Sequence, residues 1–259
     1  MKTMRIATGI LIFSTVLLTA KNVFAEEATD ALPVSRNTEV QIKFIEDNSP
    51  TDPVNPIDPD PDKPIKPVDP TDPNRPVDPG TSGPLSLDYA SILDFGEQLI
   101  SVKDQIYFAK PQYLFDKDGA VDKDNPVPNY AQVTDKRGGE KGWSLSVKQN
   151  GQFKSLKNNK ELTGAEITFK NAEVISNSDS KAPSVVKNSF SLTSDGTGVA
   201  ENVMSANEGE GFGTWIYRFG DDTTKAKSIE LSVPGSTAKE SDVYKTSLTW
   251  TLTDTPVNK

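Results

Sequence analysis

The stretch that decides the fold is Thr246-Ser247-Leu248-Thr249-Trp250-Thr251-Leu252-Thr253. Apolar and hydroxylic residues alternate in it without a break. Successive side chains of an extended strand point to opposite faces, so the leucines and the tryptophan share one face and the threonines share the other. The same Trp-x-Leu triplet occurs as Trp143-Ser144-Leu145, again among small hydroxylic residues. Two segments far apart in the chain therefore carry one strand pattern.

Similar short segments follow one another from Leu85 onward, separated by Gly, Pro and Asn turn signals. We expect strands near residues 85–89, 105–109, 143–147, 165–169, 189–193, 215–219, 229–233 and 244–253. Asn150-Gly151 predicts a hairpin with a returning strand over 153–156, and residues 116–128 read as a polar loop. No helical period extends beyond two turns. The pattern predicts an all-β fold, an antiparallel β-sandwich over residues 85–259.

Two residue types are missing from the composition, and their absence limits the chemistry. The 259 residues contain no cysteine and no histidine, which removes thiolate chemistry, the commonest general base and the commonest metal ligand. Residues 116–124 have the composition of a calcium loop, but the glycine and the bidentate glutamate are not in EF-hand positions. We expect a solvated loop there, and a protein with no metal, no cofactor, no catalytic residue and no enzymatic activity.

Residues 1–25 have the pattern of a secretory signal peptide. Lys2 and Arg5 precede an apolar run over residues 6–18 that is too short to span a bilayer, and cleavage is expected after Ala25. Removal of this leader takes the net charge from −9 to −12, because it contains three basic residues and no acid. So acidic a chain is a poor partner for nucleic acid. No Leu-Pro-x-Thr-Gly motif occurs, so we expect a secreted protein held noncovalently at the cell surface.

Two further segments lie between the leader and the β domain. Residues 26–49 include an alternating stretch, residues 38–45, which we expect to form one strand that joins the sandwich, because a lone strand is not stable. Residues 50–84 are rich in Asp and Pro, with most prolines three residues apart, which favours a solvated polyproline II rod. We interpret this segment as a loop that leaves the fold and returns. A wall-spanning spacer and a ligand for a proline-binding domain are the alternatives.

Trp143, Leu145, Trp250 and Leu252 are the candidate binding residues, and two roles are open for them. They can be core residues on the inward faces of their strands, where a tryptophan contributes a large apolar surface. Alternatively, one or both indoles are exposed and stack on the sugar rings of a glycan. The strict alternation favours the core role, because an alternating strand usually buries its apolar face.

Several segments together resemble a known family. They are residues 83–89, 94–96, 132–138, 142–147, 209–215 and 244–254. With the preceding strand and the Asp/Pro-rich spacer, they are similar to the WxL-domain surface proteins of low-GC Gram-positive bacteria, in particular the small stand-alone members. The resemblance implies noncovalent attachment to the cell wall through peptidoglycan, with both Trp-x-Leu motifs involved. It also implies partnership with surface proteins encoded nearby, and a role in adhesion to host matrix proteins or in envelope stress.

The leading hypothesis is therefore a nonenzymatic, peptidoglycan-binding surface protein. A mature charge of −12 opposes binding to an acidic wall, and Lys136, Arg137 and Lys141 beside Trp143 are expected to offset it locally. The alternative is an adhesin subunit that binds protein and is retained by partner surface proteins. A glycan hydrolase would need two carboxylates about 5–9.5 Å apart in a cleft, and no motif fixes such a pair.

Overall fold

The computed structural model describes residues 34–255, which separate into one unit ending at Lys43 and another beginning at Phe44. The expected signal peptide lies outside the described residues. Residues 34–45 form neither helix nor strand, and every one of them is exposed. The strand expected over residues 38–45 is therefore not part of any sheet in the structure. Nothing in the local sequence forbids it, but an isolated strand has no partner for its backbone groups.

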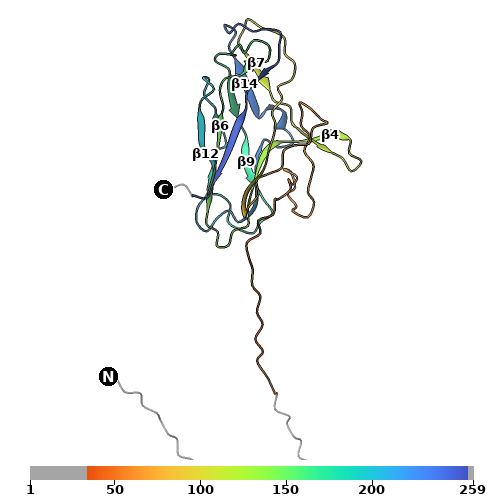
Figure 1. The fold of residues 1–259 in the computed structure, drawn as a ribbon, viewed down its shortest axis with the longest axis vertical. Helices are drawn as coiled ribbons and strands as arrows, with labels where there is room; N and C mark the ends of the chain where they lie inside the picture. Colours follow the sequence, from red (N-terminus) through yellow and green to blue (C-terminus); the bar gives the residue numbers. More distant parts are fainter. Residues whose placement is uncertain (1–33, 256–259) are drawn as a thin grey trace, which may run out of the picture. The chain divides into compact units, whose positions relative to one another are not determined.

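Three four-stranded antiparallel sheets form the main part of the described chain (Figure 1). The first contains, in order, β1 (Leu85–Ala90), β5 (Asn129–Asp135), β13 (Gly213–Phe219) and β9 (Ala172–Ile175). The second contains β10 (Val185–Val186), β12 (Val199–Ala206), β6 (Trp143–Gln149) and β16 (Leu248–Thr253). The third contains β11 (Phe190–Ser191), β8 (Glu166–Phe169), β14 (Ile229–Val233) and β2 (Gln105–Phe108).

The remaining described elements are small. β3 (Gln112–Phe115) pairs with β4 (Val121–Val127), and β7 (Lys154–Ser155) pairs with β15 (Tyr244–Lys245). The single helical element among residues 34–255 is a 3₁₀ turn, η1 (Lys225–Lys227). None of the helical structure there could reach across a membrane. The expected all-β, antiparallel fold class is confirmed.

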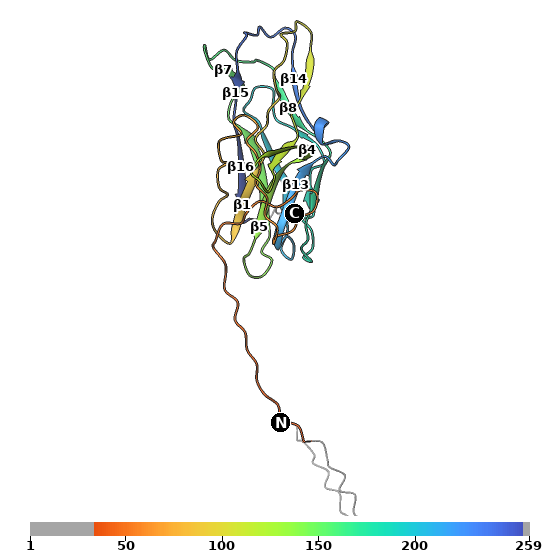
Figure 2. The ribbon, with the colours of Figure 1, turned by 90° about the vertical axis from the view of Figure 1, so that its right-hand side faces the viewer.

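One apolar core joins the three sheets, which surround it in a sandwich-like arrangement (Figures 1 and 2). Val133 comes from the first sheet, Trp143 and Leu145 from the second, and Phe169 from the third. Phe169 stacks on Phe190 with ring centroids 4.7 Å apart. Alternation brings these side chains inward, and burial of their apolar surface is the main stabilising term of the fold.

Local turn signals did not always decide the pairing. The chain does bend at Gly151, which has φ of 111°, but the following strand β7 pairs with β15 and not with β6. The expected β6–β7 hairpin is therefore wrong, because β6 pairs with β12 and β16 instead. The polar loop expected over residues 116–128 is also wrong in part: β4 occupies Val121–Val127, and residues 116–120 form the turn of the β3–β4 ribbon.

The Asp/Pro-rich segment packs on the β domain. Val54 and Val68 are buried, and the Val54 N–H donates to Gln132 Oε1 at 2.8 Å. Asp69, expected to keep the segment solvated, is buried and accepts from Arg75 Nε at 2.9 Å. The polar groups of this segment thus form hydrogen bonds to β5 and to one another where a solvated rod would bind water. The structure therefore does not show an extended, solvated rod.

Candidate functional site

The two Trp-x-Leu motifs lie on neighbouring strands of the second sheet. β6 and β16 are antiparallel, and Leu145 lies directly opposite Leu252. Trp250 lies opposite Val147, so the two tryptophans flank the leucine pair at opposite ends. Directly opposed residues share a face of the sheet. The sequence repeat therefore corresponds to one contiguous apolar row, built from two segments that are distant in the chain.

Trp143 and Leu145 are the fully buried members of this row. Each has an exposed fraction of 0%, because β6 is a central strand between β12 and β16. The Trp143 indole Nε1 donates to the Gly211 carbonyl oxygen at 3.0 Å. Gly211 has φ of 78°, and a Cβ atom there would lie 2.7 Å from Trp143 Nε1. A glycine is needed for this close approach, and the indole has no surface to offer a ligand.

Trp250 and Leu252 are half-buried, because β16 is the edge strand of its sheet. They pack against the core. The Trp250 ring meets Phe169 edge-on at a centroid distance of 6.2 Å and lies 6.4 Å from Phe219. Of the four motif residues, these two are the ones with surface exposed to solvent.

The opposite face of the same two strands carries mostly hydroxyl groups, together with the exposed Lys148 of β6 opposite Thr249. On β16, Thr249, Thr251 and Thr253 are exposed, and Ser146 on β6 is half-exposed. Thr251 lies directly opposite Ser146, and the hydroxyls of this pair make no hydrogen bond to any described residue. We call these four residues the hydroxyl face. The hydroxylic alternation is visible in the sequence, but it does not select these residues, because the pattern alone does not show which hydroxyls lack partners.

The expected basic cluster near Trp143 is neutralised. Lys136 Nζ lies 2.8 Å from Asp47 Oδ2, and Arg137 pairs with buried Asp135 at 2.9 Å. Lys141 Nζ lies 3.6 Å from Glu46. The hydrogen bond from Lys136 holds the pKa of Asp47 well below its usual range. These cations therefore do not form the free positive patch that was expected to attract an acidic wall.

A buried carboxylate links β1 to the Asp/Pro-rich segment. Asp88 accepts hydrogen bonds from Thr134 Oγ1 at 2.6 Å and from Gln132 Nε2 at 2.9 Å, as well as from Ser86. Gln132 Nε2 also donates to the Asp52 carbonyl oxygen at 3.0 Å. Burial raises the pKa of Asp88 to about 6, and the hydrogen bonds oppose that shift. With three donors around it, this carboxylate is committed to structure.

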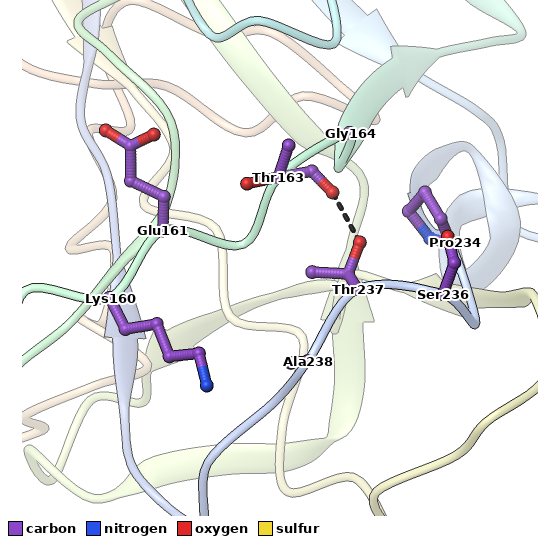
Figure 3. Close-up of a pocket in the computed structure, with 8 residues that line it drawn as sticks. All are labelled: Lys160, Glu161, Thr163, Gly164, Pro234, Ser236, Thr237 and Ala238. Atoms are coloured by element: carbon purple, nitrogen blue, oxygen red, sulfur yellow. Dashed lines mark hydrogen bonds between the residues drawn. The ribbon is translucent and has the colours of Figure 1, made fainter.

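A cavity beside the start of β8 gives no support to a hydrolase. It has a volume of about 600 Å³ (Figure 3). Its wall is held by the Thr237 hydroxyl, which donates to the Thr163 carbonyl oxygen at 2.6 Å. The one acid in its lining is Glu161, which pairs with Lys154 at 3.2 Å. A carboxylate pair for glycosidic cleavage is not present in this lining.

The candidate calcium loop is organised by its own backbone. Asp116 Oδ1 accepts from the N–H groups of Asp118 at 2.9 Å and of Ala120 at 2.8 Å. Within residues 34–255, no group of three or more acidic side chains is placed to hold a metal ion. The Asp116 carboxylate therefore closes the turn between β3 and β4.

Comparison with known families agrees with this geometry. Residues 31–256 match the family described as WxL domain surface cell wall-binding. The chain is a WxL-domain protein. The match covers nearly the whole chain and includes both Trp-x-Leu motifs, so the resemblance drawn from the sequence is confirmed. No curated protein and no solved structure matches. WxL domains form a family of surface domains that bind the cell wall, and it is not a family of enzymes.

Proposed function

We propose that this WxL protein is secreted and attaches noncovalently to peptidoglycan through the hydroxyl face. The observation that carries the proposal is the Ser146–Thr251 pair, two neighbouring outward hydroxyls without a partner among the described residues. Hydroxyls both donate and accept, so they match the hydroxyl and amide groups of a glycan. They also carry no charge, which suits an acidic protein facing an acidic wall: the net charge is −9 for the full sequence and −12 without residues 1–25.

The four motif residues support this binding by position. Trp143 and Leu145 are buried, and a buried side chain does not touch a glycan. Leu145 packs opposite Leu252, and Trp250 opposite Val147, which fixes the register of β6 and β16. A one-residue slip would turn the hydroxyls inward and the apolar row outward. Trp143, Leu145, Trp250 and Leu252 thus hold the binding surface in place.

The experiment is sedimentation of the purified protein with isolated peptidoglycan sacculi. The double variant Ser146→Ala, Thr251→Ala removes both free hydroxyls, and we expect the pelleted fraction to fall at least fivefold. The matched control is Thr168→Ala, Ser191→Ala, which alters a Thr–Ser pair directly opposed on β8 and β11 and bonded at 2.7 Å. The control is expected to pellet like the unaltered protein. Equal recovery of all three proteins would reject the hydroxyl face.

A second candidate function is a subunit of a surface complex with nearby-encoded surface proteins, active in adhesion to host matrix or in envelope stress. The observation that favours it is the exposed apolar stretch Leu99, Ile100 and Val102 close to β2. Contiguous exposed apolar residues often mark protein-binding surfaces. Retention of the protein is measured on cells that lack the partner proteins but keep an intact wall. Loss of retention would support partner binding, and unchanged retention would rule it out in favour of wall binding.

A further inference from the structure

β16 presents an open edge. The Asn150 N–H donates to the Ser247 carbonyl oxygen at 2.9 Å, so in the antiparallel register Ser247, Thr249 and Thr251 direct their backbone groups toward β6. The backbone N–H and C=O of Leu248, Trp250 and Leu252 therefore point the other way. No described residue hydrogen-bonds to them. An unpaired row of this kind is a template for a further strand.

The side chains on this edge are also incompletely covered. Leu248, Trp250 and Leu252 pack on the core but remain half-exposed. β1 lies alongside β16 (Figure 2) and adds Leu85 and Leu87, which are half-exposed as well. The margin between the two edge strands is thus apolar, and a strand added to β16 would cover it.

The neighbouring edge of β1 is, by contrast, already occupied. The Thr81 N–H donates to the Leu87 carbonyl oxygen at 2.9 Å, and the Leu87 N–H donates to Thr81 Oγ1 at the same distance. The chain thus closes one of the two edges with its own residues and leaves the other open. An incoming strand has its free backbone partners on β16.

The same chain contains an unpaired strand sequence. In residues 38–45, Val40, Ile42 and Phe44 alternate with Gln41 and Lys43. The three apolar side chains are 94%, 76% and 84% exposed. Their spacing matches that of Leu248, Trp250 and Leu252, with polar residues between them in both cases. At about 3.3 Å per residue, this stretch spans about 26 Å, against about 20 Å for β16.

We propose that residues 38–45 of one molecule add as a strand to the open edge of β16 in a second copy. The added strand would supply backbone partners for Leu248, Trp250 and Leu252, and would place Val40, Ile42 and Phe44 over the apolar margin. This mode of recognition is β-strand addition. Each copy carries one free strand and one open edge, so the contact is head-to-tail and can link further copies into a ring or an open chain.

The first test is the mass of the full chain by sedimentation equilibrium across a hundredfold concentration range. We expect the mass to rise to at least twice that of one chain. Ile42→Asp puts a charge on the apolar face of the strand and is expected to return the mass to that of a single chain. The matched control Gln41→Asp puts the same charge on the polar face and keeps the assembly. A single-chain mass at every concentration would overturn the proposal, as would assembly by Ile42→Asp.

The second test blocks the edge. Leu248→Pro removes an N–H that points away from β6, and proline is tolerated in that place because no sheet hydrogen bond is lost. Leu248→Ala trims the side chain but keeps the N–H. We expect the proline variant to be a single chain and the alanine variant to assemble. Both variants must show an unchanged far-ultraviolet spectrum. If both assemble alike, the edge of β16 is not the docking site.

The third test distinguishes a second copy from the same chain. The protein contains no cysteine, and adjacent strands bring opposed Cα atoms within disulfide range. One chain carries Gln41→Cys and a size-tagged chain carries Thr251→Cys. Oxidation of the mixture is expected to give a mixed covalent dimer. In the control mixture, Lys123→Cys replaces Thr251→Cys, and no covalent dimer is expected. A chain with both Gln41→Cys and Thr251→Cys that closes within itself, while the mixture gives no dimer, would refute exchange between copies.

Wall binding is measured on the same variants at a dilution where every protein is a single chain. Ile42→Asp is expected to pellet with sacculi like the unaltered protein. The double variant Ser146→Ala, Thr251→Ala is expected to assemble like the unaltered protein. The two proposals therefore fail independently. Loss of assembly in the hydroxyl variant would mean that the two surfaces overlap and would count against this inference.

Discussion

Replacing each motif tryptophan by phenylalanine tests whether the two indoles have different physical roles. Trp143→Phe removes the Nε1–H that bonds to the Gly211 carbonyl oxygen at 3.0 Å, at a site with 0% exposure. An orphaned buried acceptor costs about 1–3 kcal/mol, and the missing ring leaves a cavity that adds about 1 kcal/mol. We expect the free energy of unfolding to fall by about 2–4 kcal/mol.

Trp250→Phe is the matched substitution on the edge strand. The Trp250 side chain is half-exposed, and its indole N–H donates to no described residue. The change therefore removes only part of an apolar contact with Phe169 and Phe219. We expect a loss of about 1 kcal/mol or less.

Urea unfolding followed by far-ultraviolet circular dichroism measures both values, and an unchanged slope with urea shows that the same surface is exposed on unfolding. Sacculus binding is then measured per folded molecule. We expect both variants to bind like the unaltered protein, because the indoles act through the fold. Equal destabilisation by the two variants would contradict the burial argument. A binding loss confined to folded Trp250→Phe would show direct contact with the glycan.

Three further predictions concern the supports of the fold. The folded pKa of Asp88 of about 6 lies above the ordinary value of 3.8, so the folded chain binds the proton more tightly. The free energy of unfolding should fall by about 2 kcal/mol as pH rises from about 4 to about 6, and Asp88→Asn should remove this slope in urea titrations at several pH values. Gly211→Ala should lower the midpoint of thermal unfolding strongly, because the new Cβ would lie 2.5 Å from Ala206 Cβ and because φ is 78°. An unchanged midpoint would show that the loop can rearrange at little cost. Arg137→Ala leaves the carboxylate of Asp135 buried without its partner and should cost about 3–5 kcal/mol in urea unfolding, whereas a loss below 1 kcal/mol would mean that water reaches the carboxylate.

Alternating strands were the easiest to predict from the sequence. In β8, β14 and β16 the apolar side chains are more buried than the polar ones between them, whereas β1 buries Ser86 and Asp88 and leaves Leu85 and Leu87 half-exposed. β5 was missed because every residue of Asn129–Asp135 is buried, including Gln132 and Asp135. Its polar side chains form hydrogen bonds to the Asp/Pro-rich segment and to Arg137. Burial of polar residues by such partners leaves no periodic apolar pattern in the sequence.

The repeat of Trp-x-Leu predicted that the two motifs belong together, and the register of β6 and β16 agrees. Their unequal burial was not predictable from the triplets, which are nearly identical. It depends on which strand is central and which is at the edge, and distant strands decide that. For the same reason the alternation located the hydroxyls but could not show that Ser146 and Thr251 lack partners.

The pairing of β6 with β16 has a consequence for when the domain can form. Ser144 and Thr253 are 109 residues apart in the chain, yet their strands lie side by side. Contacts of such long range are made slowly, since a large loop must close before they form. A chain in which β16 is not yet available cannot complete this sheet. We therefore expect the domain to remain unfolded until its last strand has been made and is free to pair with β6.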